Sequence, residues 1–265
     1  MEILGYLLAI IIGVSLGLIG GGGSILTVPV LVYVMGISPV LSTAYSLFIV
    51  GLTALVGSFS YGKKGLLDYK TAAIFGIPSI ATVYATRKFV VPVIPDPVFH
   101  FGANIVTKDL FIMVLFAILM VAASISMIRD KKNGDDDEQR VKHYNYPLIF
   151  AEGIVVGALT GLVGAGGGFL IIPALVLLAG LPMKQAVGTS LLIIAAKSLL
   201  GFLGDIGHQV IDWKFLFLFS LFAIAGIFVG TALSRRISGA KLKPAFGWFV
   251  LIMGIYIIAK EVFFR

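Results

Sequence analysis

The sequence predicts an all-α, polytopic membrane protein built from two inverted-topology repeats. Three observations predict this class: an apolar composition, apolar runs of helix length, and an internal repeat. Of the 265 residues, 59% are hydrophobic and 12% are charged, whereas soluble domains carry about 45–50% apolar and about 25% charged residues. So few charged residues leave too little polar surface to face water on every side. The lipid bilayer is therefore the expected solvent.

Apolar runs of the length needed to cross a bilayer occur in both halves of the chain. About 20 residues of α-helix span the ~30 Å hydrocarbon core. Since backbone groups in lipid must bond to one another, only helices and closed barrels span it, and the alternating pattern of barrel strands is absent from the sequence. The run from Ile3 follows Met1-Glu2 without Lys or Arg, so it is expected to be a mature helix rather than a signal peptide. The longest runs are residues 109–128, 186–203, 215–233 and 244–259.

An internal repeat becomes visible when the sequence is aligned with itself at a shift of 144 residues. Gly17–Ser24 then falls on Gly161–Gly168 without a gap. Matches of Gly, Pro and Asp at one offset are hard to obtain by chance, whereas Leu and Ile matches are common in apolar sequence. Other such matches are Pro29 with Pro173, Gly36 with Gly180, and Asp68 with Asp212.

Each copy is expected to contain two short helices separated by glycines, followed by three long transmembrane helices. The second short segment, residues 25–34 or 169–179, has only ten or eleven residues. Such a segment covers only ~15–17 Å, about half a bilayer, so we expect a re-entrant pair or two short tilted helices. The expected units are membrane repeat one at residues 1–128, a charged cytoplasmic linker at 129–146, and membrane repeat two at 147–265.

The distribution of Lys and Arg predicts which face is cytoplasmic. If each copy crosses the membrane an odd number of times, the loops of one face carry thirteen Lys and Arg residues and those of the other carry six, Arg87 and Lys108 among them. If each short pair counts as one span, the division is eleven to eight. Because positive loops stay in the cytoplasm, the odd count is favoured. The expectation is a multi-pass protein of the inner (plasma) membrane with inverted copies and both termini outside.

Residue usage argues against several kinds of site. The chain has no Cys, which excludes thiol chemistry and Cys-ligated metals, and its three His lie far apart in predicted loops. No helical carboxylate pair, nucleophile elbow, P-loop or HExxH motif is present. We expect no enzyme activity, metal or cofactor. Cytoplasmic loops account for the net charge of +7, so no nucleic-acid partner is expected.

The glycine runs are the first candidate substrate-binding residues. Glycine permits positive φ and close approach to backbone amides, and the N-termini of interrupted helices direct N–H groups at anions in transporters. The alternative is tight helix packing, which small residues also allow. The candidates are Gly20, Gly21, Gly22, Gly23 and Ser24 in the first copy, and Gly166, Gly167 and Gly168 in the second.

Polar residues within the predicted spans are the remaining candidates: Thr43, Ser46, Thr189, Ser190 and Lys197. The hydroxyls either bind substrate or bond to a carbonyl one turn earlier or to a neighbouring helix. Lys197 lies in mid-helix, where a charge costs ~3 kcal/mol or more and usually faces a cavity or a partner. Its alternative is to extend its side chain to the membrane interface.

The glycine segments resemble the duplicated motif of the TauE/SafE (TSUP) family of membrane permeases. The resemblance is carried by Gly17–Ser24 through Pro29, by Gly161–Gly168 through Pro173, and by Ala186–Leu191. The first copy differs from that third segment, since it has Ser42–Leu47 there. The resemblance implies transport of small sulfur-containing or carboxylate anions, such as sulfite or organosulfonates.

These expectations combine into a secondary transporter of a small anion that works by alternating access. The glycine breaks would hold the anion and Lys197 would balance its charge. An uncoupled, channel-like pore and a non-transporting membrane scaffold are the alternatives. The expected partners are a small anion and the lipid bilayer; the sequence specifies neither a coupling ion, H⁺ or Na⁺, nor an oligomeric state. Acidic residues are scarce deep in the spans, which argues against a carboxylate proton relay.

Overall fold

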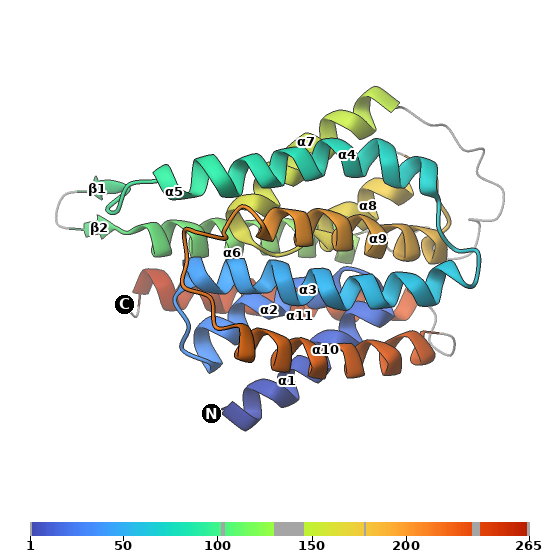
Figure 1. The fold of residues 1–265 in the computed structure, drawn as a ribbon, viewed down its shortest axis with the longest axis horizontal. Helices are drawn as coiled ribbons and strands as arrows, with labels where there is room; N and C mark the ends of the chain where they lie inside the picture. Colours follow the sequence, from blue (N-terminus) through green and yellow to red (C-terminus); the bar gives the residue numbers. More distant parts are fainter. Residues whose placement is uncertain (1, 102–103, 130–145, 178, 235–238, 264–265) are drawn as a thin grey trace.

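The protein is a bundle of long helices that lie side by side along one direction (Figure 1). The computed structural model describes residues 2–101, 104–129, 146–177, 179–234 and 239–263; the linker expected at 129–146 falls almost wholly outside them. Its helices are α1 (Glu2–Ile19), α2 (Gly22–Pro29), the π-helical η1 (Val30–Val34), α3 (Pro39–Gly62), α4 (Tyr69–Ala85), the π-helical η2 (Thr86–Val90), α5 (Val91–Val93), α6 (Lys108–Arg129), α7 (Tyr146–Val163), α8 (Gly168–Leu177), α9 (Met183–Phe202), α10 (Trp213–Leu233) and α11 (Gly239–Phe263).

The predicted all-α class is confirmed, with one small addition. A short antiparallel hairpin joins β1 (Phe99–Phe101) to β2 (Asn104–Val106) between α5 and α6. Its segment contains three prolines and has no counterpart in the second half of the sequence. The hairpin projects from one end of the bundle, away from the packed helices (Figure 1).

Among the described residues, four helices are long and apolar enough to cross a membrane: α3, residues 108–125 of α6, α9 and α10. Their outward faces carry large apolar side chains, for example Phe217, Leu221 and Phe228 on α10, which are 57%, 63% and 54% exposed. A water-soluble helix would place polar residues on such a face. The exposed faces are therefore suited to lipid.

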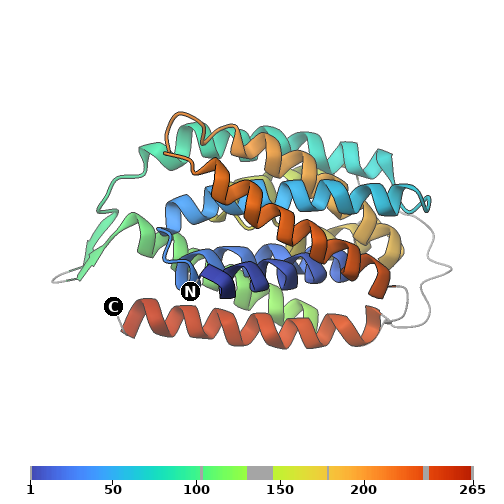
Figure 2. The same ribbon diagram turned by 60° about the horizontal axis from the view of Figure 1, so that its bottom comes forward.

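The first short helix pair forms a hairpin that begins and ends at one end of the bundle. From the N-terminal end, α1 runs inward, and α2 with η1 returns to that end, where α3 begins (Figures 1 and 2). The two chain termini lie at this same end (Figures 1 and 2). A hairpin of this kind fits the re-entrant pair expected from the sequence.

Helices related by the shift of 144 residues run in opposite directions. In Figure 1, α3 leads away from the end that holds the termini, whereas α9 leads toward it, and α6 and α11 are opposed in the same way. The packing partners also exchange, because α1 packs against α10 while α7 packs against α4. Each pair is the counterpart of the other at the same shift.

Hydrogen bonds between the two halves repeat this exchange at the level of single atoms. The backbone N–H of Asp68 donates to Thr189 Oγ1 at 2.9 Å, and the backbone N–H of Asp212 donates to the hydroxyl of Tyr45 at 2.8 Å. Asp68 and Asp212 are 144 residues apart, and so are Tyr45 and Thr189. Each half thus fixes the start of a long helix in the other half.

The same two aspartates cap the helices that follow them. Asp68 Oδ1 accepts from the N–H of Thr71, and Asp212 Oδ1 accepts from the N–H of Phe215 at 3.0 Å. Removal of an N-cap acceptor costs about 1 kcal/mol. We expect Asp212→Ala to lower the thermal midpoint of the detergent-solubilised protein, and Asp212→Asn, which keeps a side-chain acceptor, to restore most of it. Equal midpoints for Asp212→Ala and the wild type would show that this cap does not stabilise α10.

Candidate functional site

Both glycine runs interrupt their helices, as the sequence predicts. In the first half, α1 ends at Ile19 and α2 begins at Gly22, with Gly20 at a φ of +76°. In the second half, α7 ends at Val163 and α8 begins at Gly168; Gly164, Gly166 and Gly167 have φ values of +70°, +61° and +67°. Residues with a Cβ rarely adopt these left-handed values, so the backbone here requires glycine.

The two breaks pack directly against each other in the interior. A Cβ built on Gly21 would overlap the backbone of Gly168, and a Cβ on Gly168 would overlap the backbone of Gly21. A Cβ on Gly166 would lie 3.2 Å from Cβ of Ser24. Close packing and helix interruption, the two interpretations of the glycines, therefore both hold. Because α2 and α8 each begin at this contact, the positive ends of two helix dipoles meet there.

Lys197 lies against the second break. Its side chain is fully buried, and Nζ donates to Thr160 Oγ1 at 3.1 Å. A Cβ built on Gly167 would come within 2.6 Å of Nζ. Full burial contradicts the alternative in which Lys197 reaches the membrane interface. Its charge instead lies beside the N-terminus of α8.

No acidic side chain within the described part of the chain forms an ion pair with Lys197. A lysine ammonium and a helix N-terminus are both positive, so each destabilises the other in a low-dielectric interior. An anion placed between them would relieve this repulsion and supply the missing counter-charge. The arrangement at Lys197 and Gly167 is thus suited to binding an anion.

The predicted hydroxyl ligands fall into two groups. Ser46 is fully buried, and its Oγ has no hydrogen-bond partner among the residues that the structure describes. Ser190 Oγ donates to the Val187 carbonyl at 2.8 Å and lies 3.4 Å from the Gly20 carbonyl, so it faces the first break. Ser190 is thus in position to contribute to a site at the first break, and the Ser46 hydroxyl lies in the protein interior.

The other hydroxyls all form hydrogen bonds within the protein. Ser24 Oγ donates to the Gly21 carbonyl at 2.7 Å, and Thr43 Oγ1 donates to the Val40 carbonyl at 2.6 Å. Thr189 Oγ1 accepts the hydrogen bond that holds the start of α4. Thr189 therefore has a structural role, while Ser24 and Thr43 keep lone pairs and lie at the breaks.

The last turn of α7 brings several of these groups together. Thr160 accepts from Lys197, as described above. A Cβ on Gly161 would lie 2.7 Å from Cβ of Thr86, and a Cβ on Gly164 would overlap Thr43. Three helices from both halves of the chain thus converge on one turn, where Gly161 and Gly164 allow the close approach.

A groove opens at the far ends of α3 and α10, at the end of the bundle opposite the termini (Figure 1). Its volume is about 330 Å³, and Lys63 and Lys64 give it a positive character. The groove is lined by Ser60, Lys63, Lys64, Phe228, Thr231 and Ala232.

Comparison with known proteins identifies the family of this chain. A family model described as "Sulfite exporter TauE/SafE" matches residues 5–257. The chain belongs to the TauE/SafE family. A "Probable membrane transporter protein" of Xylella fastidiosa is 31% identical over 255 residues, which cover 95% of this chain and 92% of that relative. The "Probable membrane transporter protein YunE" of Bacillus subtilis is 27% identical over 274 residues and 97% of each chain. No solved structure matches the chain significantly.

This TauE/SafE protein is a membrane transporter, which agrees with its lipid-suited helices and its interrupted interior. The family assignment confirms the resemblance seen in the glycine segments. The relatives are named as transporters and not as enzymes, in agreement with the expectation that the chain is no enzyme.

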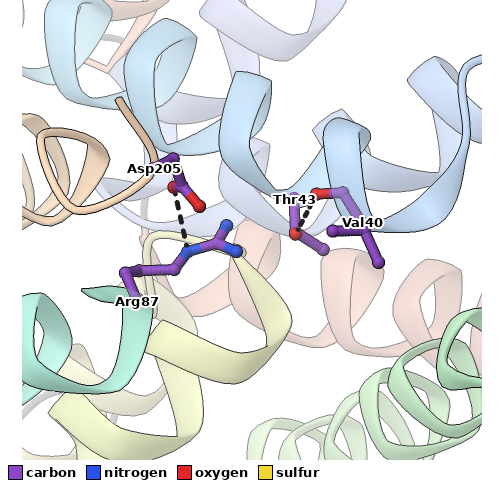
Figure 3. Close-up of polar contacts among 4 residues, drawn as sticks. All are labelled: Val40, Thr43, Arg87 and Asp205. Atoms are coloured by element: carbon purple, nitrogen blue, oxygen red, sulfur yellow. Dashed lines mark hydrogen bonds and ion pairs between the residues drawn. The ribbon is translucent and has the colours of Figure 1, made fainter. Parts of the chain in front are cut away.

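One buried ion pair of the TauE/SafE protein was missed at the level of sequence. Arg87 Nε lies 3.3 Å from Asp205 Oδ2, and the two side chains are 0% and 4% exposed (Figure 3). Counting Arg87 among the loop charges was wrong, because the helix continues through η2 and buries it. A usable signal was the apolar run Phe89–Val91, which extends the helix beyond Arg87.

Proposed function

We propose that this TauE/SafE protein is a secondary transporter of a small anion that binds where the two glycine breaks meet. The observation that carries the proposal is Lys197, a fully buried lysine beside the second break whose one hydrogen bond to the described residues is to the neutral Thr160. A resident cation of this kind is costly in a membrane protein unless it has a function. Gly166, Gly167, Gly168 and Lys197 supply one side of the site. Gly20, Gly21, Gly22, Gly23, Ser46 and Ser190 supply the other.

The substrate is a small oxyanion, with sulfite or an organosulfonate as the proposed class. Backbone N–H groups, hydroxyls and one lysine suit the several oxygen acceptors of such a group. All candidate side chains are buried, so a compact anion fits this interior better than a large one. The description of the matching family model, "Sulfite exporter TauE/SafE", points to the same class.

The mechanism is alternating access by two inverted repeats, residues 1–128 and 147–265. This arrangement is supported by the opposed directions of α3 and α9 and by the exchanged hydrogen bonds of Asp68 and Asp212. Inverted repeats with interrupted helices hold substrate near the midplane and rock around it. The distribution of Lys and Arg supports an orientation in the plasma membrane with the linker inside and both termini outside.

Counterflow in proteoliposomes tests the proposal. Vesicles loaded with unlabelled sulfite should accumulate labelled sulfite transiently, and the initial rate should saturate with concentration. Repeating the measurement with imposed proton and sodium gradients identifies any coupling ion. Flux without counterflow would instead indicate a channel-like pore. Absence of flux for sulfite, sulfate, methanesulfonate and acetate would leave a scaffold role and would end the transporter proposal.

A further inference from the structure

Arg87 is the largest fully buried side chain within the described part of the structure. It belongs to η2, a π-helical segment that follows α4. Its Nη1 and Nη2 atoms have no hydrogen-bond partner among the described residues. Nε approaches Asp205 at 3.3 Å, but neither Nε nor Asp205 Oδ2 is in hydrogen-bond geometry. Asp205 thus places a negative charge near the Arg87 guanidinium but accepts no hydrogen bond from it.

A buried guanidinium with unused donors is expensive. It presents five N–H donors in a rigid plane, and a buried donor without an acceptor loses its hydration without compensation, which costs most when the donor is charged. A protein normally retains such a group by pairing it completely, or keeps it for recognition of a carboxylate- or phosphate-like oxyanion. In the described residues, Arg87 is paired on one edge only.

The repeat shows that the fold does not require this ion pair. At the shift of 144 residues, Arg87 corresponds to Thr231 and Asp205 to Tyr61. Thr231 Oγ1 donates to the Phe228 carbonyl, and the Tyr61 hydroxyl donates to the Gly17 carbonyl at 3.2 Å. The equivalent place in the other half is therefore built from neutral side chains. Thr231 also lines the groove of about 330 Å³.

Arg87 is continuous with the Lys197 site. Its chain neighbour Thr86 packs against Gly161, in the turn of α7 that also carries the Thr160 partner of Lys197. Asp205 follows Lys197 by eight positions and lies in the turn just after the end of α9 at Phe202. In Figure 3 the terminal nitrogens of Arg87 point away from η2, toward the side on which Thr43 lies. Thr43 packs against Gly164 of the second break.

We propose that Arg87 forms a second anion-binding subsite, between Lys197 and the end of the bundle that holds the termini. The ligand is a sulfonate, sulfite or carboxylate group that accepts from Nη1 and Nη2 while Asp205 holds the Nε edge. This subsite rests on the proposed anion transport and deepens it, because an anion leaving Lys197 toward that end reaches Arg87 next. Asp205 competes with the anion for the same charge, so it keeps the subsite weak enough to release its ligand.

Ligand-dependent thermal stability, measured on the purified full chain with sulfite and with methanesulfonate, tests the subsite. The background is Lys197→Met, so that binding at Lys197 does not contribute. In this background the anions should still raise the thermal midpoint in a saturable way. Adding Arg87→Lys, which keeps the charge but removes the fork, should weaken the apparent affinity about tenfold or more. Unchanged affinity in Arg87→Lys, or no anion-dependent shift in the Lys197→Met background, would overturn the subsite.

Asp205→Asn provides a second measurement that does not depend on the folding of the Arg87 variant. Removing the competing carboxylate charge should tighten anion binding in the same background. Equal or weaker binding would mean that the pair is only a structural link, and would also overturn the subsite. Failure of the proposed anion transport can be told apart from failure of the subsite, because the wild type would then show no saturable anion flux. The matched control is Lys88→Met, which removes the neighbouring but exposed cation of η2 and should leave the affinity unchanged.

Discussion

Replacement of Lys197 with Met is expected to reduce saturable anion counterflow about 30-fold or more. The side chain is the fully buried cation beside the second break, and a bound anion would interact with it in a low-dielectric interior. Loss of one partner from a buried charge pair costs about 2–5 kcal/mol, and 1.4 kcal/mol corresponds to a factor of ten. The initial rate of labelled sulfite uptake into preloaded proteoliposomes measures the effect.

The same substitution should not destabilise the fold, which separates a functional role from a structural one. Met has a similar length, and removing an unpaired buried charge is neutral or stabilising. The thermal midpoint of Lys197→Met in detergent, without anion, should equal or exceed that of the wild type. Lys184→Met, an exposed lysine in the first turn of the same helix, is the control and should transport normally. Wild-type flux in Lys197→Met would remove Lys197 from the mechanism.

Gly21→Ala is expected to abolish transport by separating the two breaks. Gly21 has a φ of −147°, outside the left-handed region, so the expected effect comes from the contact that the added methyl group makes. The added methyl group would overlap the backbone of Gly168, and a backbone cannot rotate away as a side chain can. Overpacking of this kind costs about 1–3 kcal/mol or more. We expect a lower thermal midpoint and uptake at the level of empty vesicles.

Two other glycines provide matched controls for that result. Gly36 has a φ of +70° with nothing within 4 Å of an added Cβ, so Gly36→Ala tests backbone strain without overlap, at about 1–2 kcal/mol. In α4, a Cβ on Gly76 would have its nearest neighbour, Ile193, at 4.0 Å, so Gly76→Ala should be tolerated. If Gly21→Ala transports as well as Gly76→Ala, the close contact of the breaks is not needed for function.

The sequence predicts best those features whose residue types can play only a few roles in a membrane helix. Glycine-rich segments matched at a single offset, Gly20–Gly23 and Gly164–Gly168, have few roles in a membrane helix besides interruption and close packing, and they have both. A lysine flanked by apolar residues, such as Lys197, similarly has few options in lipid. Its burial could be predicted, but its contact with Gly167 could not, because that contact depends on how two helices pack.

The features that could not be predicted depend on pairs of residues far apart in the chain. Arg87 and Asp205 lie in different halves, and each taken alone resembles an interfacial charge. For Thr189 the sequence left open a ligand role or a bond to a neighbouring segment, and its hydroxyl accepts from the backbone N–H of Asp68. Neither contact can be inferred from the residues that are close to it in the sequence. The hairpin β1–β2 was missed for another reason, since a proline-rich segment gives no strand pattern to follow.

The hydrogen bonds of Asp68 and Asp212 have a thermodynamic consequence. When two halves make the same contacts at interchangeable positions, a motion that alters one half can be compensated by the reverse motion in the other. Under the proposed alternating access, the states open to either side of the membrane would then differ little in free energy, and neither would be strongly favoured. Net movement of the proposed anion would follow its concentration difference and any coupled ion, so one chain would serve uptake in one setting and efflux in another.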